Sequence, residues 1–293
     1  QGIGASAPRV VSQAMIRDTS SGPTMARMMS FVMTVFIVVP VIAPILGQLV
    51  IWLANWELIF ITLAGYSILI LFWLLNGQRE TLKEKRPFDF VSIKQGFFEV
   101  FQNKITLGYT VIIGIIFGGL VSFLNISQPL FQETFKVGDK FPFYFAGTAL
   151  IIGCSALINS RLVSEIDLKV IITCALLWVW VWSGLFLIFS FTFRELELLG
   201  FMIFSIPAFA TLGFLFSNVN ALALTPMGHI AGTASATIGT ISNILAVFIG
   251  AFTSHFFIGA PTPLIAVFFV GASFNLVLLI KLRQFQLVTF REK

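Results

Sequence analysis

Charge is scarce in this sequence. Of its 293 residues only 11% are Asp, Glu, Lys or Arg, whereas 57% are hydrophobic. Soluble domains carry roughly 25% charged residues, so this chain has too little polar surface for a soluble fold. The scarcity excludes a soluble globular protein and predicts an integral membrane protein. The net charge is +5, but the basic residues lie between apolar runs. This pattern does not indicate nucleic-acid binding.

Cysteine and histidine are scarcer still. The two cysteines, Cys154 and Cys174, lie in separate apolar segments, and we expect both to be reduced. The two histidines form no cluster with cysteines, so we expect no metal site. Motifs of enzymes are also missing, among them a Gly-rich phosphate loop, His-Glu-x-x-His and a paired acidic motif for metal–diphosphate chemistry. We therefore expect neither an enzyme nor a cofactor.

The apolar residues are gathered into long runs, as in a multi-pass membrane protein. A helix needs about 20 apolar residues to cross the hydrocarbon core of a bilayer. The predicted elements are a partial helix over residues 1–16 and full spans over 25–52, 57–75, 106–130, 142–160, 168–191, 198–222, 230–256 and 262–281.

Basic residues set the expected orientation, because cytoplasmic loops are enriched in Lys and Arg. If the polar segment 76–105 lies in the cytoplasm, most Lys and Arg residues fall on the cytoplasmic side. Only Lys136, Lys140 and Arg194 then fall on the opposite side. The C-terminus is expected in the cytoplasm.

The number of spans on either side of segment 76–105 predicts the domain organisation. Many transporters consist of two six-helix halves with a central site between them. We therefore expect the remainder of an N-terminal half over 1–75, a cytoplasmic central loop over 76–105, a six-helix C-terminal half over 106–283 and a cytoplasmic tail over 284–293. On this division the chain lacks about the first three helices and part of the fourth. The alternative is a genuine nine-span protein.

Ionisable residues inside a membrane mark function, but the predicted spans contain almost none. No carboxylate falls at the middle of a span, so any proton-titrating carboxylate is expected in a segment before residue 1. Arg9 either faces a substrate cavity or extends to the headgroups. The amides of Asn125, Gln128 and Asn243 either line a polar cavity or hydrogen-bond between helices. We take these four residues as candidates for the substrate cavity, and expect Asn275 to serve packing.

Residues 35–50, VFIVVPVIAPILGQLV, place Pro40, Pro44 and Gly47 inside an apolar run. Proline removes a backbone donor and costs about 3 kcal/mol in a helix interior, so the pair indicates a bend that the protein uses. The pattern PVIAPILG resembles the antiporter motif on the fifth helix of major facilitator transporters. Ala43-Pro44 replaces the Gly-Pro of this motif, and Gln48 replaces its last Gly.

Further segments resemble the Bcr/CflA-type branch of the drug-resistance exporters in that superfamily, in the same order. QGIGASAPRVVSQAMIRD is similar to the branch's fourth helix, which ends in a cytoplasmic-loop motif, here Arg17-Asp18. The other similar segments are NWELIF, RETL at 79–82, SQPLFQETF and AGTASATIG.

The resemblance implies an all-α membrane fold, a facilitator with two six-helix halves seen here from within helix four onward. It implies export of small amphipathic compounds in exchange for protons, by alternating access. Pro40, Ala43, Pro44 and Gly47 would then bend the fifth helix at the interface between the halves. The expected partners are a small-molecule substrate, protons and the bilayer of the bacterial inner membrane, with the protein a monomer. The alternatives are a facilitator for an endogenous metabolite, such as a sugar, amino acid or siderophore, and a non-transporting membrane protein.

Overall fold

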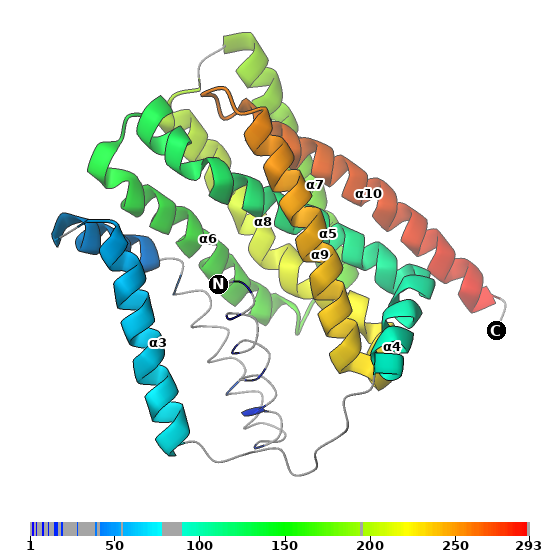
Figure 1. Ribbon diagram of the computed structural model, residues 1–293. Helices are drawn as coiled ribbons and strands as arrows, with labels where there is room; N and C mark the ends of the chain where they lie inside the picture. Colours follow the sequence, from blue (N-terminus) through cyan, green and yellow to red (C-terminus); the bar gives the residue numbers. More distant parts are fainter. Residues whose placement is uncertain are drawn as a thin grey trace. The chain divides into compact units, whose positions relative to one another are not determined.

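The computed structural model describes residues 42–53, 55–77, 90–193 and 196–291, together with a few single positions before residue 42. The chain forms two compact units, Gln1–Phe88 and Asp89–Lys293. Every regular element in the described residues is a helix (Figure 1). Seven of these helices are long and apolar enough to cross a membrane.

The described part of the first unit consists of two apolar helices. The helix Ile42–Leu53 is followed by a short turn and by α3 (Glu57–Gly77). Glu57 lies in the first turn of α3, where a carboxylate interacts favourably with the helix dipole. None of the residues of α3 is buried, although nearly all are apolar. A helix that is apolar on all sides is suited to a lipid environment or to burial among other helices.

The second unit is a bundle of long helices with shorter ones at their ends. Its elements in chain order are α4 (Phe90–Gln102), α5 (Lys104–Pro129), η1 (Leu130–Thr134), η2 (Gly138–Lys140), α6 (Phe141–Leu162), α7 (Leu168–Phe193), α8 (Leu198–Leu224), η3 (Thr225–Ile230), α9 (Ala231–His255) and α10 (Thr262–Arg291).

The helices confirm the spans predicted from residue 57 onward. α3 and α5 to α10 each coincide with one predicted span to within a few residues, except that α10 continues to Arg291, well beyond the expected end at 281. The predicted helix over 1–16 and most of the span over 25–52 lie outside the described residues. The polar segment 76–105 also contains a helix, α4, which the high content of charged residues concealed.

The most extensive helix contact of the bundle is that of α5 with α9, followed by those of α7 with α10, α6 with α8 and α7 with α8. In a membrane the hydrophobic effect does not drive helices together, so their association depends on close packing. Small residues allow the helix backbones to approach closely enough for this packing. A Cβ atom added to Gly118 on α5 would lie 2.7 Å from Cδ1 of Ile249 on α9. The small residues of GIIFGG at 114–119 therefore serve helix packing.

Hydroxyl and indole groups also join these helices by hydrogen bonds. Such bonds are the second source of stability in membrane helix bundles. The joined residues are Ser122 with Thr253 (2.8 Å) and Ser242 with the Thr110 carbonyl (3.1 Å) between α5 and α9, and Ser190 with Thr262 (2.7 Å) and Trp180 with Ser273 (2.8 Å) between α7 and α10.

Aromatic side chains fill the core at the end of the bundle where α5 stops. Phe131, in the π-helix η1, is fully buried at the centre of this group. Aromatic pairs at such distances contribute about 0.5–1.5 kcal/mol each beyond their buried area. The rings around Phe131 are those of Tyr144 and Phe201 (centroids at 5.7 Å), Phe135 and Phe141 (6.0 Å) and Phe123 (6.5 Å).

Candidate substrate site

The last turn of α5 carries two of the predicted cavity residues, Asn125 and Gln128. Both side chains are exposed, and residues three apart lie on adjacent positions of one helix face. Pro129, the last residue of α5, has no N–H and so cannot donate to the carbonyl of Asn125 four residues earlier. The N–H of Leu130 bonds instead to the carbonyls of Ile126 and Ser127. This turn therefore presents two side-chain amides and a backbone carbonyl that lacks its helical donor.

The chain continues from this turn into a π-helix, η1 (Leu130–Thr134). Short π-helical segments are rare, and they occur frequently at functional sites. Glu133 and Thr134 follow the buried Leu130 and Phe131, so the segment is anchored on one side by the aromatic core. The anchoring holds the end of α5 in place.

Asn125 also lies against α9. Its Nδ2 atom is 3.0 Å from the position that a Cβ on Gly250 would occupy. Asn243 lies on the same helix two turns before Gly250, a distance of about 10 Å along the axis. Its neighbour Ser242 donates to the Thr110 carbonyl on α5, whereas Asn243 itself is exposed. The structure thus places Asn125 and Asn243 beside the contact between α5 and α9.

None of the amides of Asn125, Gln128 and Asn243 hydrogen-bonds to another described residue. Two buried amides behave differently, since Asn159 and Asn218 pair with each other between α6 and α8. Two roles are compatible with the sequence pattern of the three exposed amides, lining a polar cavity or bonding between helices. Within the described residues they do not bond between helices.

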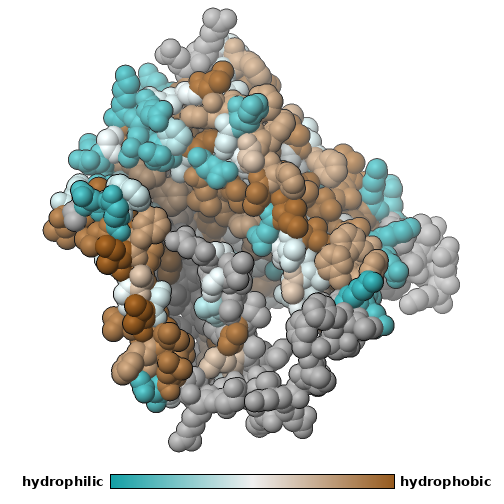
Figure 2. Space-filling view, in the orientation of Figure 1, coloured by the Kyte–Doolittle hydropathy of each residue, from teal (hydrophilic) through white to brown (hydrophobic). Residues whose placement is uncertain are grey.

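The exposed face of α9 from Gly232 to Asn243 is small and polar, and we call it the α9 polar stripe; after Asn243 the exposed side chains of α9 are apolar, beginning with Ile244 and Val247. Figure 2 shows pale and teal side chains among the brown ones on this side of the bundle. A Cβ on either glycine of the stripe would meet no atom within 4 Å, so the stripe is open. Its members, at helical spacing, are Gly232, Ser235, Ala236, Gly239, Thr240 and Asn243.

The exposed face of α10 has the opposite character. It presents bulky apolar side chains at Val270, Phe274, Val277 and Ile280, each more than half exposed. Lipid tails favour such a surface and offer no hydrogen bonds to a polar one. The α9 polar stripe therefore differs in kind from the faces suited to lipid.

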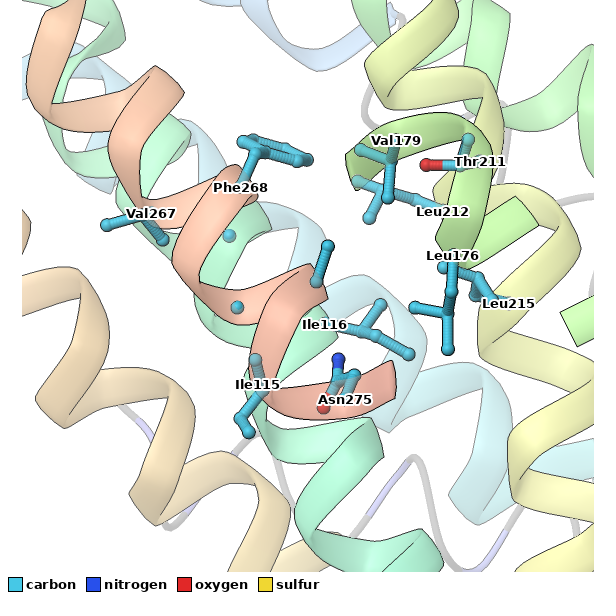
Figure 3. A pocket seen from close by; sticks show the side chains of 13 residues that line it. Ile115, Ile116, Leu176, Val179, Thr211, Leu212, Leu215, Val267, Phe268 and Asn275 are labelled. Atoms are coloured by element: carbon cyan, nitrogen blue, oxygen red, sulfur yellow. The ribbon is translucent and has the colours of Figure 1, made fainter. Parts of the chain in front are cut away.

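A separate pocket lies inside the bundle between α5, α7, α8 and α10 (Figure 3). Its volume is about 30 Å³, whereas sites for drug-sized ligands measure roughly 300–1,000 Å³. Asn275 is almost completely buried there, and its Oδ1 atom has no hydrogen-bond partner among the described residues. Thr211 is the other polar side chain of the lining. The pocket has room for about one water molecule and is too small for a drug.

The motif expected on the fifth helix lies in the first unit. Ala43, Pro44 and Gly47 belong to the helix Ile42–Leu53, with Ala43 exposed and Pro44 and Gly47 partly buried. A Cβ on Gly47 would meet no atom within 4 Å. The remaining predicted residues lie outside the described part of the chain, namely Arg9, Arg17, Asp18 and Pro40.

Comparison with known proteins identifies the family. Residues 1–251 match the model of the Major Facilitator Superfamily. The chain belongs to this superfamily. As a major facilitator protein it is a multi-pass membrane protein that acts on a small-molecule substrate and is not an enzyme. The family and the all-α membrane fold predicted from the sequence are thereby confirmed.

Relatives within the superfamily carry names of drug-resistance proteins. The bicyclomycin resistance protein homolog of Haemophilus influenzae is 27% identical over 278 residues, which cover 93% of this chain and 68% of the relative. The MFS-type transporter YdgK of Bacillus subtilis, which is uncharacterized, is 25% identical over 84% of this chain and 62% of its own length. The multidrug resistance protein MdtL of Shewanella oneidensis is 34% identical over 44% of this chain and 33% of its own. The chain thus spans about two thirds of the length of the first two relatives.

Proposed function

We propose that the full-length protein exports small amphipathic compounds in exchange for protons, by alternating access in the bacterial inner membrane. The observation that carries this proposal is the similarity to the bicyclomycin resistance protein homolog, which extends over 93% of the chain. The drug-resistance name of MdtL supports the same class of substrate.

The polar groups beside the contact of α5 and α9 are the proposed substrate contacts. Small-molecule sites combine a mostly apolar lining with a few polar groups that orient the ligand. Asn125, Gln128 and Asn243 supply amide donors and acceptors, none of which is engaged with another described residue. The Asn125 carbonyl adds an acceptor, because Pro129 cannot donate to it. Apolar parts of a substrate would contact neighbouring aliphatic and aromatic side chains.

The α9 polar stripe supports a cavity on this side of α9. Polar groups exposed to hydrocarbon are costly, so Ser235, Thr240 and Asn243 are suited to a water-accessible cavity. On the resemblance alone, Arg9 is proposed to face a substrate cavity, and Arg17 and Asp18 are proposed to form a cytoplasmic-loop motif.

The helix Ile42–Leu53 has a proposed role in alternating access. Proline kinks a helix, and a residue without a side chain allows close approach of a partner helix. Pro40, Ala43, Pro44 and Gly47 would together bend this helix and let another helix cross it. We further propose that the protein is a monomer with its C-terminus in the cytoplasm.

A transport assay tests the proposed function. Inverted membrane vesicles with the full-length protein would receive an imposed proton gradient, and uptake of a chloramphenicol-like compound would be followed with and without an uncoupler. We expect uptake that the uncoupler abolishes. Uptake that persists with the uncoupler would refute proton exchange. Absence of uptake for every drug tested would refute drug export, and an untargeted screen of exported solutes would then follow.

A further inference from the structure

Helix α4 ends directly before α5, which is long and apolar enough to cross a membrane. A single residue, Asn103, separates α4 from the membrane-spanning helix α5. Asn103 has an extended backbone (φ −81°, ψ 101°), and its Oδ1 accepts hydrogen bonds from the N–H groups of Ile105 (3.1 Å) and Thr106 (3.0 Å). It therefore caps α5 and turns the chain, so that α4 leaves α5 at an angle at one end of the bundle (Figure 1).

One face of α4 is fixed on the bundle. Gly96 and Val100, one turn apart, are both buried. A Cβ on Gly96 would lie 2.7 Å from Cγ2 of Thr233, in the first turn of α9. A side chain at this position would force Thr233 to shift, because the two helices approach so closely. The position of α4 is therefore set by contact with α9, at the level where α5 enters the membrane.

A second face of α4 carries exposed phenylalanines. Phe97, Phe98 and Phe101 are 39%, 53% and 42% exposed. At about 100° per residue they share one side of the helix with Lys94. The ring of Phe97 packs on that of Phe101 with centroids 4.9 Å apart, and Lys94 Nζ lies 6.0 Å from the centre of the Phe98 ring.

The third face of α4 is polar. Gln95, Glu99 and Gln102 lie together between the aromatic face and the face against the bundle, and Gln95 and Gln102 are exposed. The helix thus has three sectors, one against the bundle, one aromatic and one suited to water. Helices that lie in a membrane interface have an apolar face, a polar face and basic residues at the boundary.

We propose that α4 is a membrane-surface helix whose aromatic face enters the lipid leaflet in which α5 begins. Its phenylalanines lie below the headgroups, and Lys94 extends along the Phe98 ring to anionic headgroups. Lys104, the exposed first residue of α5, adds a second cation at the same level. Lipid is the partner of the aromatic face, because the chain crosses the membrane immediately after Asn103. The aromatic face of α4 therefore lies at the bilayer surface. The proposed contact of α4 with lipid does not depend on the proposed substrate or on proton exchange.

Spin labels measure the depth of each face. The full-length protein with Cys154 and Cys174 replaced by Ala would carry a single Phe98→Cys or Phe101→Cys change and a nitroxide label, in vesicles of phosphatidylcholine with 30% phosphatidylglycerol. We expect these labels to be more accessible to oxygen than to a water-soluble nickel complex. Gln95→Cys is the matched control on the polar face, with the opposite expected order. Equal nickel accessibility at 101 and 95 would overturn the proposal, as would protection of 101 from both reagents, which would indicate a protein partner.

A second measurement tests the headgroup contact. The label at 98 should lie deeper in vesicles that contain phosphatidylglycerol than in phosphatidylcholine alone, and Lys94→Gln should remove at least half of this difference. A depth that is independent of the anionic lipid, or of Lys94, would refute the contact with anionic headgroups.

Discussion

Asn159 on α6 and Asn218 on α8 form a reciprocal amide pair. Nδ2 of Asn159 donates to Oδ1 of Asn218 (3.1 Å), and Nδ2 of Asn218 donates to Oδ1 of Asn159 (2.8 Å). Asn159 also donates to Oγ of Ser217 (3.0 Å). Both asparagines are buried, so each satisfies the other in a medium that offers no water. The pair joins α6 to α8 at a defined level of the bundle.

Replacing one member of this pair should destabilise the bundle. Asn218→Leu leaves the amide of Asn159 buried without its partner, and we expect a loss of about 1 kcal/mol in the free energy of unfolding. Thermal unfolding of the purified full-length protein in detergent would measure it. The double variant Asn159→Leu/Asn218→Leu should lose less than the sum of the two single variants, because no unpaired amide remains. Additive losses would show that the two amides are not coupled.

Gly213 on α8 lies directly against the backbone of α6. A Cβ at this position would lie 2.6 Å from the Ile152 carbonyl oxygen and 2.7 Å from the Ala156 nitrogen, and would also overlap Oγ of Ser155. Because backbone atoms cannot move aside as a side chain can, we expect Gly213→Ala to destabilise the protein by roughly 1–3 kcal/mol. Gly147→Ala on α6 is the matched control, since its Cβ would meet nothing within 4 Å. If both variants unfold at the same temperature, the close approach is wrong.

Asn243 is the most direct test of the proposed substrate contacts. Loss of one hydrogen bond is worth about 0.5–1.5 kcal/mol, so Asn243→Ala should raise the KM for drug uptake roughly two- to tenfold. Asn76→Ala provides the control, because Asn76 is an exposed amide that donates to its own helix, to the Phe72 carbonyl (2.9 Å). The measurement is the concentration dependence of uptake at equal protein levels. A KM for Asn243→Ala equal to that of Asn76→Ala would remove Asn243 from the site.

Pro44 tests the proposed bend in the helix Ile42–Leu53. Pro44→Ala restores a backbone N–H and relieves the clash that kinks a helix. We expect a lower rate of export with unchanged insertion into the membrane, measured by transport and by the amount of protein in the membrane fraction. An unchanged export rate would refute the role of this proline.

The spans could be read from the sequence because the thickness of a bilayer dictates the length of an apolar helix. The expected span 168–191 corresponds to α7, Leu168–Phe193, and the other spans from residue 57 onward correspond equally well apart from the extended α10. The order of the motifs likewise pointed to the superfamily that residues 1–251 match. The spans depend on local composition, and the family resemblance depends on the order of motifs along the chain. Both can be read from the sequence without knowledge of tertiary contacts.

Helix α4 was not apparent from the sequence. Segment 76–105 is rich in charge, and α4 is short, so neither length nor composition indicated this helix. Its three sectors become clear once Gly96 is found against Thr233. A 13-residue helix depends on such tertiary contacts for its stability.

The sequence by itself determined that this is a membrane protein, which segments from residue 57 onward form helices long enough to cross a membrane, and to which superfamily it belongs. Only the tertiary structure decided where the amides inside the described spans lie and which of them pair. Asn159 and Asn218 pair, Asn275 is buried beside a small pocket, and Asn125 lies beside Gly250 with its amide exposed. The same residue type takes three roles because an amide in a membrane is defined by its partner, and the partner lies on another helix far away in the chain.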